Sequence, residues 1–90
     1  MLNVVVSNQF KKDLKLAEKR GFDLLLLKEV VDKLADGERL PDKKRDHSLT
    51  GNYAGFRECH ILPDWLLIYR IDEDDVLLFL FRSGTHSDLF

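Results

Sequence analysis

Apolar residues in the first half of the chain follow the spacing of one strand and two helices. Residues 2–6 form a β-branched run, which predicts a strand. After it, Phe10, Leu14 and Ala17 recur at the i, i+4, i+7 spacing of an amphipathic helix, and Ser7 is a suitable N-cap. A second helical stripe follows and consists of Leu27, Val30, Val31 and Leu34. Because the link between the two stripes is short, the pattern predicts a helical hairpin.

Glycine and aspartate mark the ends of these helices. Gly21 follows the first stripe and Gly37 the second, where a residue in the left-handed conformation commonly ends a helix. Asp23 is placed to cap the start of the second helix. Residues 38–54 contain a proline, glycine and many polar residues, which predicts a loop or irregular segment.

The period of the pattern changes to two in the second half of the chain, which predicts strands. Three strands are expected, over residues 56–62, 65–71 and 76–82. Pro63-Asp64 forms the first turn between them and the four acidic residues 72–75 form the second. Ser83-Gly84 is expected to break the last strand, and residues 85–88 have capping-box spacing for a final helical turn.

This order of elements predicts an α+β fold in a single domain over residues 1–90. We expect an N-terminal strand, a helical hairpin packed on one face of a mainly antiparallel four-stranded sheet, and a short C-terminal helical turn. Trp65 and Tyr69 lie in an apolar strand and are expected in the core. The other face of the sheet is expected to be free as a working surface.

Composition indicates the class of protein and the compartment in which it works. Hydrophobic residues make up 44% and charged residues 33% of the chain, which is typical of a globular protein. The single cysteine excludes an internal disulfide and a cysteine-based zinc site, and it suits a reducing compartment. Neither a signal peptide nor a membrane-spanning run is present, so we expect a cytoplasmic protein without a membrane partner.

Charge is distributed unevenly along the chain. The net charge of −2 argues against indiscriminate binding to nucleic acid. Residues 1–45 hold 11 Lys and Arg against 8 Asp and Glu, whereas residues 46–90 hold 3 against 8. Half of the acids in the second stretch belong to the predicted tip at 72–75, and without that tip the net charge is +2. A local basic surface is therefore compatible with the sequence.

Three histidines are the candidate chemical groups. His47, His60 and His86 are expected in a loop, at a strand end and at a helix start, where catalytic groups are often held over a rigid scaffold. Histidine suits proton transfer near neutral pH. Arg57 precedes His60 by three residues and Arg82 precedes His86 by four. These pairs are compatible with a site that binds an anion of the size of a phosphate. RNA supplies its own nucleophile, the 2′-hydroxyl, and histidines with arginines can promote its attack without a metal.

Each of these residues also has an ordinary structural explanation. A histidine in an alternating strand is more often a satisfied structural residue, and those in a loop or first helical turn are more often solvated. Their irregular spacing does not resemble a metal-ligand motif. The basic run Lys43-Lys44-Arg45 is more often a solvated loop than a phosphate-binding track.

Taken together, however, the motifs of the second half resemble the YafQ branch of the RelE-like toxin ribonucleases. The matching stretches are DHSLTG at 46–51, GFRECH at 55–60, PDWLLIY at 63–69 and RSGTHSDLF at 82–90. The order of elements also matches, so the resemblance covers almost the whole chain.

The resemblance implies the toxin of a toxin–antitoxin pair, an endoribonuclease that cleaves messenger RNA on the translating ribosome without a metal or cofactor. It implies products with 2′,3′-cyclic phosphate and 5′-hydroxyl ends. The acid–base set implied by the family pattern is His47, His60, Asp64 and His86. Arg82 would stabilise the phosphate in the transition state and Phe90 would contact a base. The other candidate RNA-binding residues are Lys43, Lys44, Arg45 and Arg57.

The resemblance leaves some alternatives open. Which histidine is base and which is acid is not settled, although His86 is favoured as the acid, with His47 or His60 on the nucleophile side. The expected partners are messenger RNA in the ribosomal A site, ribosomal RNA, and an antitoxin that covers the His/Arg face with an extended or helical segment. The alternatives are a ParE-like toxin directed at DNA gyrase, whose relatives do not present this three-histidine set, and a non-catalytic binding module.

Overall fold

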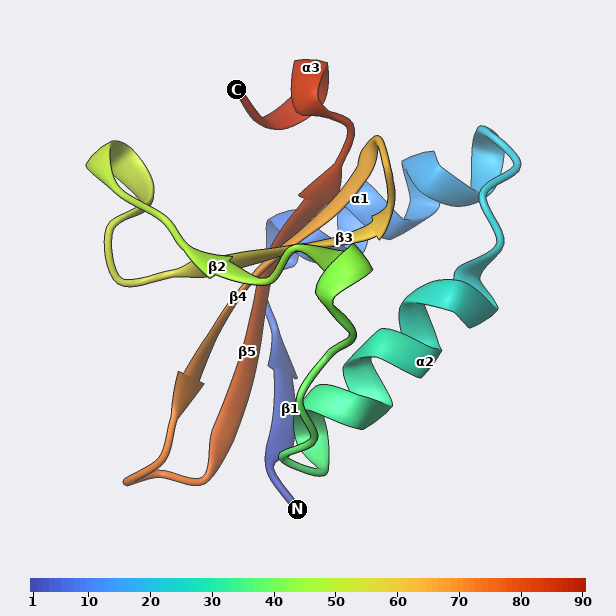
Figure 1. The fold of residues 1–90 in the computed structure, drawn as a ribbon. Helices are drawn as coiled ribbons and strands as arrows, with labels where there is room; N and C mark the ends of the chain where they lie inside the picture. Colours follow the sequence, from blue (N-terminus) through green and yellow to red (C-terminus); the bar gives the residue numbers. More distant parts are fainter.

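The computed structural model describes all 90 residues and contains a five-stranded sheet with three α-helices (Figure 1). The strands are β1 (Asn3–Val6), β2 (His47–Ser48), β3 (Arg57–Leu62), β4 (Trp65–Asp72) and β5 (Leu77–Gly84). The helices are α1 (Asn8–Lys19), α2 (Leu24–Ala35) and α3 (His86–Leu89), with two short 3₁₀ turns, η1 (Asp42–Lys44) and η2 (Gly51–Tyr53). The strand order is β1-β5-β4-β3-β2, and only β1 and β5 run parallel. The predicted α+β class is confirmed.

The ends of the two long helices follow the predicted caps. The Ser7 side chain accepts a hydrogen bond from the backbone N–H of Phe10, and the Asp23 carboxylate accepts one from Leu25. Gly21 and Gly37 have φ of +79° and +77°, a conformation that glycine adopts without steric cost. No helix in this fold has the length and apolar character required to cross a membrane.

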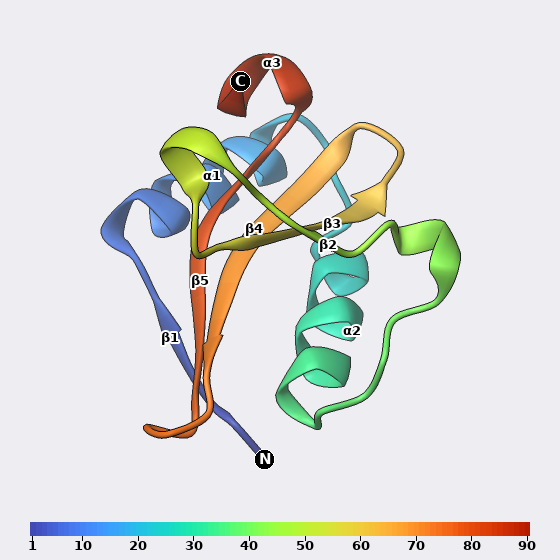
Figure 2. The ribbon, with the colours of Figure 1, turned by 60° about the vertical axis from the view of Figure 1, so that its left-hand side comes forward.

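Both long helices cover the same face of the sheet, as predicted. Figures 1 and 2 show α1 behind the end of the sheet that carries α3, and α2 along the side near β3. Trp65 and Tyr69 are buried in the core between helices and sheet, together with Phe10 from α1 and Leu34 from α2. The indole N–H of Trp65 donates to the hydroxyl of Ser83, so the largest core side chain has no unsatisfied donor.

The opposite face of the sheet is only partly free, contrary to the expectation of an open working surface. A second apolar cluster covers part of it, because η2 and α3 fold over the strands there (Figure 2). Its buried members are Leu66, Ile68 and Leu89, and the partly buried side chains around them are Leu49, Tyr53, Phe56 and Phe81. The open parts of this face lie around β2, β3 and the start of α3, and at the other end of the sheet, where Val5 and Arg70 are exposed.

Two strand assignments from the sequence need correction. The sheet has five strands instead of four, since His47–Ser48 pairs with β3 inside the segment predicted to be irregular. A two-residue polar edge strand carries no alternation that could reveal it. The last strand also continues through Ser83 and Gly84, because these residues stay paired with Leu67 and Leu66 of β4, and the Ser83 hydroxyl also donates to the Leu66 carbonyl. At its other end, Val76 lies in the turn with φ of +56°.

Beyond the end of β1, helix α1 takes over the pairing of the β5 edge. β1 ends at Val6 opposite Leu80, and the β4–β5 register then shifts at a bulge. The Ser7 hydroxyl donates to the Phe81 carbonyl at 2.6 Å, and the buried Asp13 carboxylate accepts from the Ser83 backbone N–H at 3.0 Å. Side chains of α1 thus occupy edge positions where a longer β1 would have bonded, which fixes α1 against the strand that leads to α3.

Candidate active site

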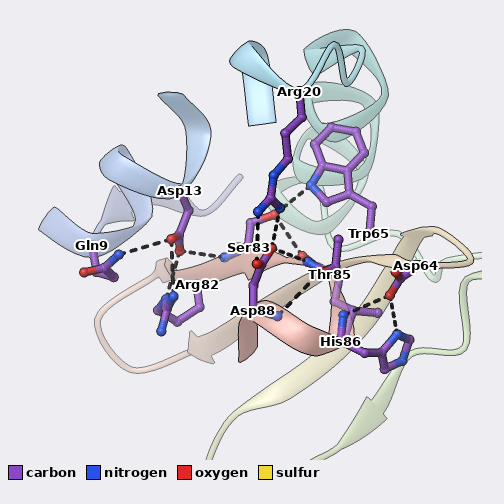
Figure 3. A network of polar contacts seen from close by, with 11 residues as sticks. Gln9, Asp13, Arg20, Asp64, Trp65, Arg82, Ser83, Thr85, His86 and Asp88 are labelled. Atoms are coloured by element: carbon purple, nitrogen blue, oxygen red, sulfur yellow. Dashed lines mark hydrogen bonds and ion pairs between the residues drawn. The ribbon is translucent and has the colours of Figure 1, made fainter. Parts of the chain in front are cut away.

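His86 is the first residue of α3, and Asp64 in the β3–β4 turn fixes its ring. The Asp64 Oδ1 atom accepts the backbone N–H of His86 at 2.9 Å and lies 2.5 Å from the Nδ1 atom of the ring (Figure 3). These two hydrogen bonds hold the pKa of the Asp64 carboxyl below its usual range, and the one from the backbone N–H has the larger effect. With Nδ1 directed at a carboxylate, Nε2 is the ring nitrogen left to face a substrate.

α3 is too short to be stable alone, and Asp88 holds it in place. Thr85 and Asp88 form the predicted capping box, in which each side chain accepts from the backbone N–H of the other residue. Asp88 also pairs with the Arg20 guanidinium at 2.6 Å, and this bond holds the pKa of its carboxyl well below the usual range. A methyl group at Gly84 would lie 2.9 Å from the Asp88 Cβ atom, so the helix packs where the strand has no side chain.

His47 and His60 face a common carboxylate, Glu58, on the partly open side of the sheet. Glu58 lies directly opposite His47 in the β2–β3 register and two residues before His60 on β3. Its Oε1 atom lies 3.6 Å from His47 Nε2 and 3.5 Å from His60 Nε2. The Nδ1 atoms point to backbone carbonyls, 2.6 Å from Arg45 O for His47 and 3.2 Å from Pro63 O for His60.

The rings of His60 and His86 connect the two halves of this cluster. Their centroids are 5.6 Å apart, with an angle of 61° between the ring planes. β2, β3, the β3–β4 turn and α3 therefore bring together all four members of the expected acid–base set, His47, His60, Asp64 and His86.

Arg82 forms an ion pair with Asp13 of α1 and does not contact the histidines. Its Nε and Nη2 atoms donate to the Asp13 carboxylate at 2.9 and 3.3 Å, and these bonds raise the pKa of the guanidinium. Figure 3 shows Arg82 beside Asp13 and apart from His86. The guanidinium keeps Nη1 free of this ion pair, and α1 thus determines where that nitrogen points.

The basic run at 43–45 lines a cavity next to His60. The cavity has a volume of about 350 Å³, and its lining residues are Lys43, Lys44, Arg45, His60, Ile61, Leu62 and Pro63. Lys44 donates to the Ile61 carbonyl at 2.9 Å, whereas the side chains of Lys43 and Arg45 are exposed.

The two remaining RNA-binding candidates lie outside this cavity. Arg57 donates to Asp46 at 3.2 Å and to the Ser48 hydroxyl at 2.9 Å, so its guanidinium is engaged within the fold. Phe90 lies after the end of α3 with 64% of its surface exposed, and its ring meets Tyr53 edge to face at 5.4 Å.

A family model described as "Bacterial toxin of type II toxin-antitoxin system, YafQ" matches residues 2–90. The chain belongs to the YafQ toxin family. The resemblance found in the sequence is thereby confirmed.

Relatives of this YafQ-family toxin match it over nearly their whole length. The mRNA interferase toxin YafQ of Escherichia coli K12 is 42% identical over 89 residues, which cover 98% of this chain and 95% of that protein. A metal-bound toxin from Helicobacter pylori has 50% identity and a TM-score of 0.94, with full coverage of both chains. The E. coli DinJ–YafQ complex gives 41% identity and a TM-score of 0.90, over 100% of this chain and 99% of that chain.

Sequence reasoning missed two acidic residues of this YafQ-family toxin, Glu58 and Asp13. A signal for Glu58 was present, since residues two apart on a strand point to the same face and Glu58 precedes His60 by two. No local signal marks Asp13, because its partner Arg82 lies 69 residues away in the chain.

Proposed function

We propose that this YafQ-family toxin is a ribosome-dependent endoribonuclease that cleaves messenger RNA in the ribosomal A site. The observation that carries the proposal is the cluster of three histidines and Asp64 at one end of the sheet, with the rings of His60 and His86 5.6 Å apart. The name of the E. coli relative, mRNA interferase, agrees with it. The substrate places the enzyme in the cytoplasm, where translation takes place.

The proposed reaction is a transesterification within the RNA. The 2′-oxygen attacks the adjacent phosphorus and loses its proton to a base, while the bond to the 5′-oxygen breaks and that oxygen takes a proton from an acid. The products carry a 2′,3′-cyclic phosphate and a 5′-hydroxyl. The histidines move both protons and the RNA supplies the nucleophile, so we propose a reaction without a metal or cofactor.

Asp64 suits His86 for the role of acid. It holds Nδ1 and the backbone N–H of His86 and leaves Nε2 directed outward, where a proton can reach the leaving oxygen. His47 or His60 then acts on the nucleophile side.

Arg82 and Phe90 complete the proposed contacts with RNA. The free Nη1 of Arg82 would stabilise the negative charge of the transition-state phosphate, held in place by the bonds of Asp13 to the other nitrogens. The exposed ring of Phe90 would stack on a base near the scissile bond. Arg57 would act indirectly, since Asp46 and Ser48 occupy its guanidinium.

The proposed protein partner is an antitoxin that covers the His/Arg face. The E. coli relative is described in complex with DinJ, and a partner seated over His60 and His86 would exclude RNA from both rings. Binding should therefore protect the amides around His47, His60 and His86 from hydrogen exchange.

Mapping of RNA 5′ ends in a reconstituted translation system tests the proposed function. We expect cuts inside codons of translated messages, 5′-hydroxyl ends, and the same rate for untreated toxin and for toxin stripped of metal by EDTA and dialysed before it is added. Equal cleavage of naked RNA would refute the dependence on ribosomes, and loss of cleavage by the stripped toxin would refute the metal-free reaction. Absence of cleavage together with inhibition of DNA gyrase would favour the ParE-like alternative, and absence of both a binding module.

Replacing Lys43 and Arg45 together by glutamine is expected to weaken binding to the RNA substrate and to lower its salt dependence. Both side chains line the cavity beside His60, where they can pair with RNA phosphates. Each lost phosphate contact reduces the slope of log affinity against log salt by about 0.7 to 0.9, so the slope should fall by about 1.5 in this variant. The measurement is KM for ribosome-dependent cleavage over a range of salt concentrations.

The matched control removes two charges elsewhere. Lys12 and Lys19 are exposed on α1, and their double glutamine variant should keep the wild-type slope. An equal loss in both double variants would mean that the overall charge, and not the cavity, determines RNA binding.

A further inference from the structure

A buried carboxylate between two histidines is the feature that the proposed reaction has not used. We propose that Glu58 is a positioning residue, which holds His47 and His60 as a pair with a proton kept between its carboxylate and the rings. This inference rests on the proposed function only for its consequence for catalysis, and the arrangement of protons can be tested without RNA.

The backbone around both rings determines where their first proton lies. Carbonyl oxygens only accept hydrogen bonds. His47 Nδ1 is 2.6 Å from Arg45 O and His60 Nδ1 is 3.2 Å from Pro63 O, so each Nδ1 atom carries a hydrogen. In a neutral imidazole the other nitrogen, Nε2, would then be bare.

Both Nε2 atoms, however, face the same oxygen of Glu58. The distances to Oε1 are 3.6 Å from His47 and 3.5 Å from His60. An ionised carboxylate only accepts, so two bare nitrogens and an ionised carboxylate would place lone pairs against one another. A second proton on a ring, or one on the Oε1 atom of Glu58, removes this conflict and lies between Oε1 and an Nε2 atom.

Burial of Glu58 favours such a proton. Only 5% of the Glu58 surface is exposed, and its Oε2 atom has no hydrogen-bond partner. A buried carboxylate without a compensating charge is costly. The strands that flank Glu58 contribute His47 from β2 and Ile68 from β4, and His60 lies on its own strand. Arg70 lies on the same face of β4, where its guanidinium stacks over Phe56. The two imidazoles are the basic groups within 4 Å of the Glu58 carboxylate.

The two rings differ in access, which suggests how the pair works. The His60 side chain is 9% exposed and is held from both sides, whereas that of His47 is 50% exposed at the sheet edge. RNA can therefore reach His47 directly, while Glu58 and His60 keep its ring oriented and balance its charge. Glu58 acts through the histidines and does not need to touch RNA.

Glu58→Gln tests the inference because it keeps the shape and removes the charge. We expect kcat for ribosome-dependent cleavage to fall about 10- to 100-fold, the range typical for residues that orient metal-bound histidines. KM should change little, because Glu58 lies out of reach of RNA. The limb of the pH–rate profile that reports the histidine pair should move to lower pH, since loss of the negative charge disfavours a charged imidazole.

Two variants serve as controls for Glu58→Gln. Glu58→Asp keeps the carboxylate and should restore the wild-type shape of the pH profile even where the rate is reduced. Glu29→Gln removes a charge from the exposed face of α2 and should change neither the rate nor the profile. A reduced kcat with an unchanged pH profile in Glu58→Gln would assign Glu58 a purely structural role and overturn the inference.

Nitrogen-15 NMR of the histidine side chains in the wild-type protein tests the proton arrangement independently of catalysis and of how the variant folds. At pH 7 we expect hydrogen on Nδ1 of both His47 and His60, together with a proton between an Nε2 atom and Glu58. Bare Nε2 atoms on both rings, with no such proton, would refute the pair. If the NMR result is as expected and no RNA is cleaved, the proposed function fails and the proton-sharing pair stands.

Discussion

Replacing His86 with alanine is expected to lower the rate of RNA cleavage by about 10²- to 10⁴-fold, the usual contribution of a general acid or base. The reason is geometric: Asp64 directs Nε2 of His86 outward, and alanine offers no proton there. The measurement is the cleavage rate from 5′-end mapping in the translation system, together with the growth arrest caused by expressing the toxin.

The variant should keep its fold, since 54% of the His86 side chain is exposed. The hydrogen bonds of the capping box, which Thr85 and Asp88 form, also remain. Its thermal unfolding should stay close to that of the wild type. Ser87→Ala, one position further on the exposed side of α3, is the matched control and should cleave at the normal rate. If His86→Ala cleaves as fast as Ser87→Ala, the acid must be another group.

Replacing Asp13 with alanine is expected to lower the free energy of unfolding by about 3 kcal/mol, because a buried ion pair loses one partner. The buried Asp13 carboxylate accepts from Arg82 Nε and Nη2 and from the Ser83 backbone N–H. Alanine leaves these donors without a partner in a region that water reaches only in part. Urea-induced unfolding measures the loss, and cleavage should also fall because Arg82 is no longer oriented.

A double-mutant cycle separates the ion pair from the general loss of an acid on α1. Arg82→Met removes the charge that Asp13 neutralises, so Asp13→Ala should cost less in the Arg82→Met background than in the wild type. Glu18→Ala removes an exposed acid from the same helix and should change stability by less than about 0.5 kcal/mol. Additive effects of Asp13→Ala and Arg82→Met would show that the two side chains do not support each other.

Local chemistry in the sequence predicted those elements whose ends have their own signals. Ser7, Asp23 and the Thr85/Asp88 capping box each occur where the structure places a helix start. The apolar runs around Trp65 and Tyr69 likewise identified the centre of the sheet. These features depend on residues within four positions of one another, so a single sequence contains them.

The features that were missed depend on pairing across the fold. His47–Ser48 becomes a strand only because β3 lies beside it, and Ser83 continues β5 because Leu66 and Asp13 bind it there. The residues of the site also fall into those that the sequence indicates and those that only the fold reveals. The sequence supplied the histidines and Asp64 as candidates, but the position of Glu58 between two rings emerges only when β2 pairs with β3.

The close packing of Asp88 on Gly84 bears on how such a toxin can lose its activity under selection. A glycine codon becomes an alanine codon by a single base change, and the added methyl group would meet Asp88 at 2.9 Å. Because Asp88 lies on α3, we expect the clash to displace the helix, and His86 with it, without altering any residue of the cluster. A gene could therefore be silenced in evolution while every histidine is retained. To judge whether a copy is active, position 84 has to be inspected for glycine in addition to the three histidines.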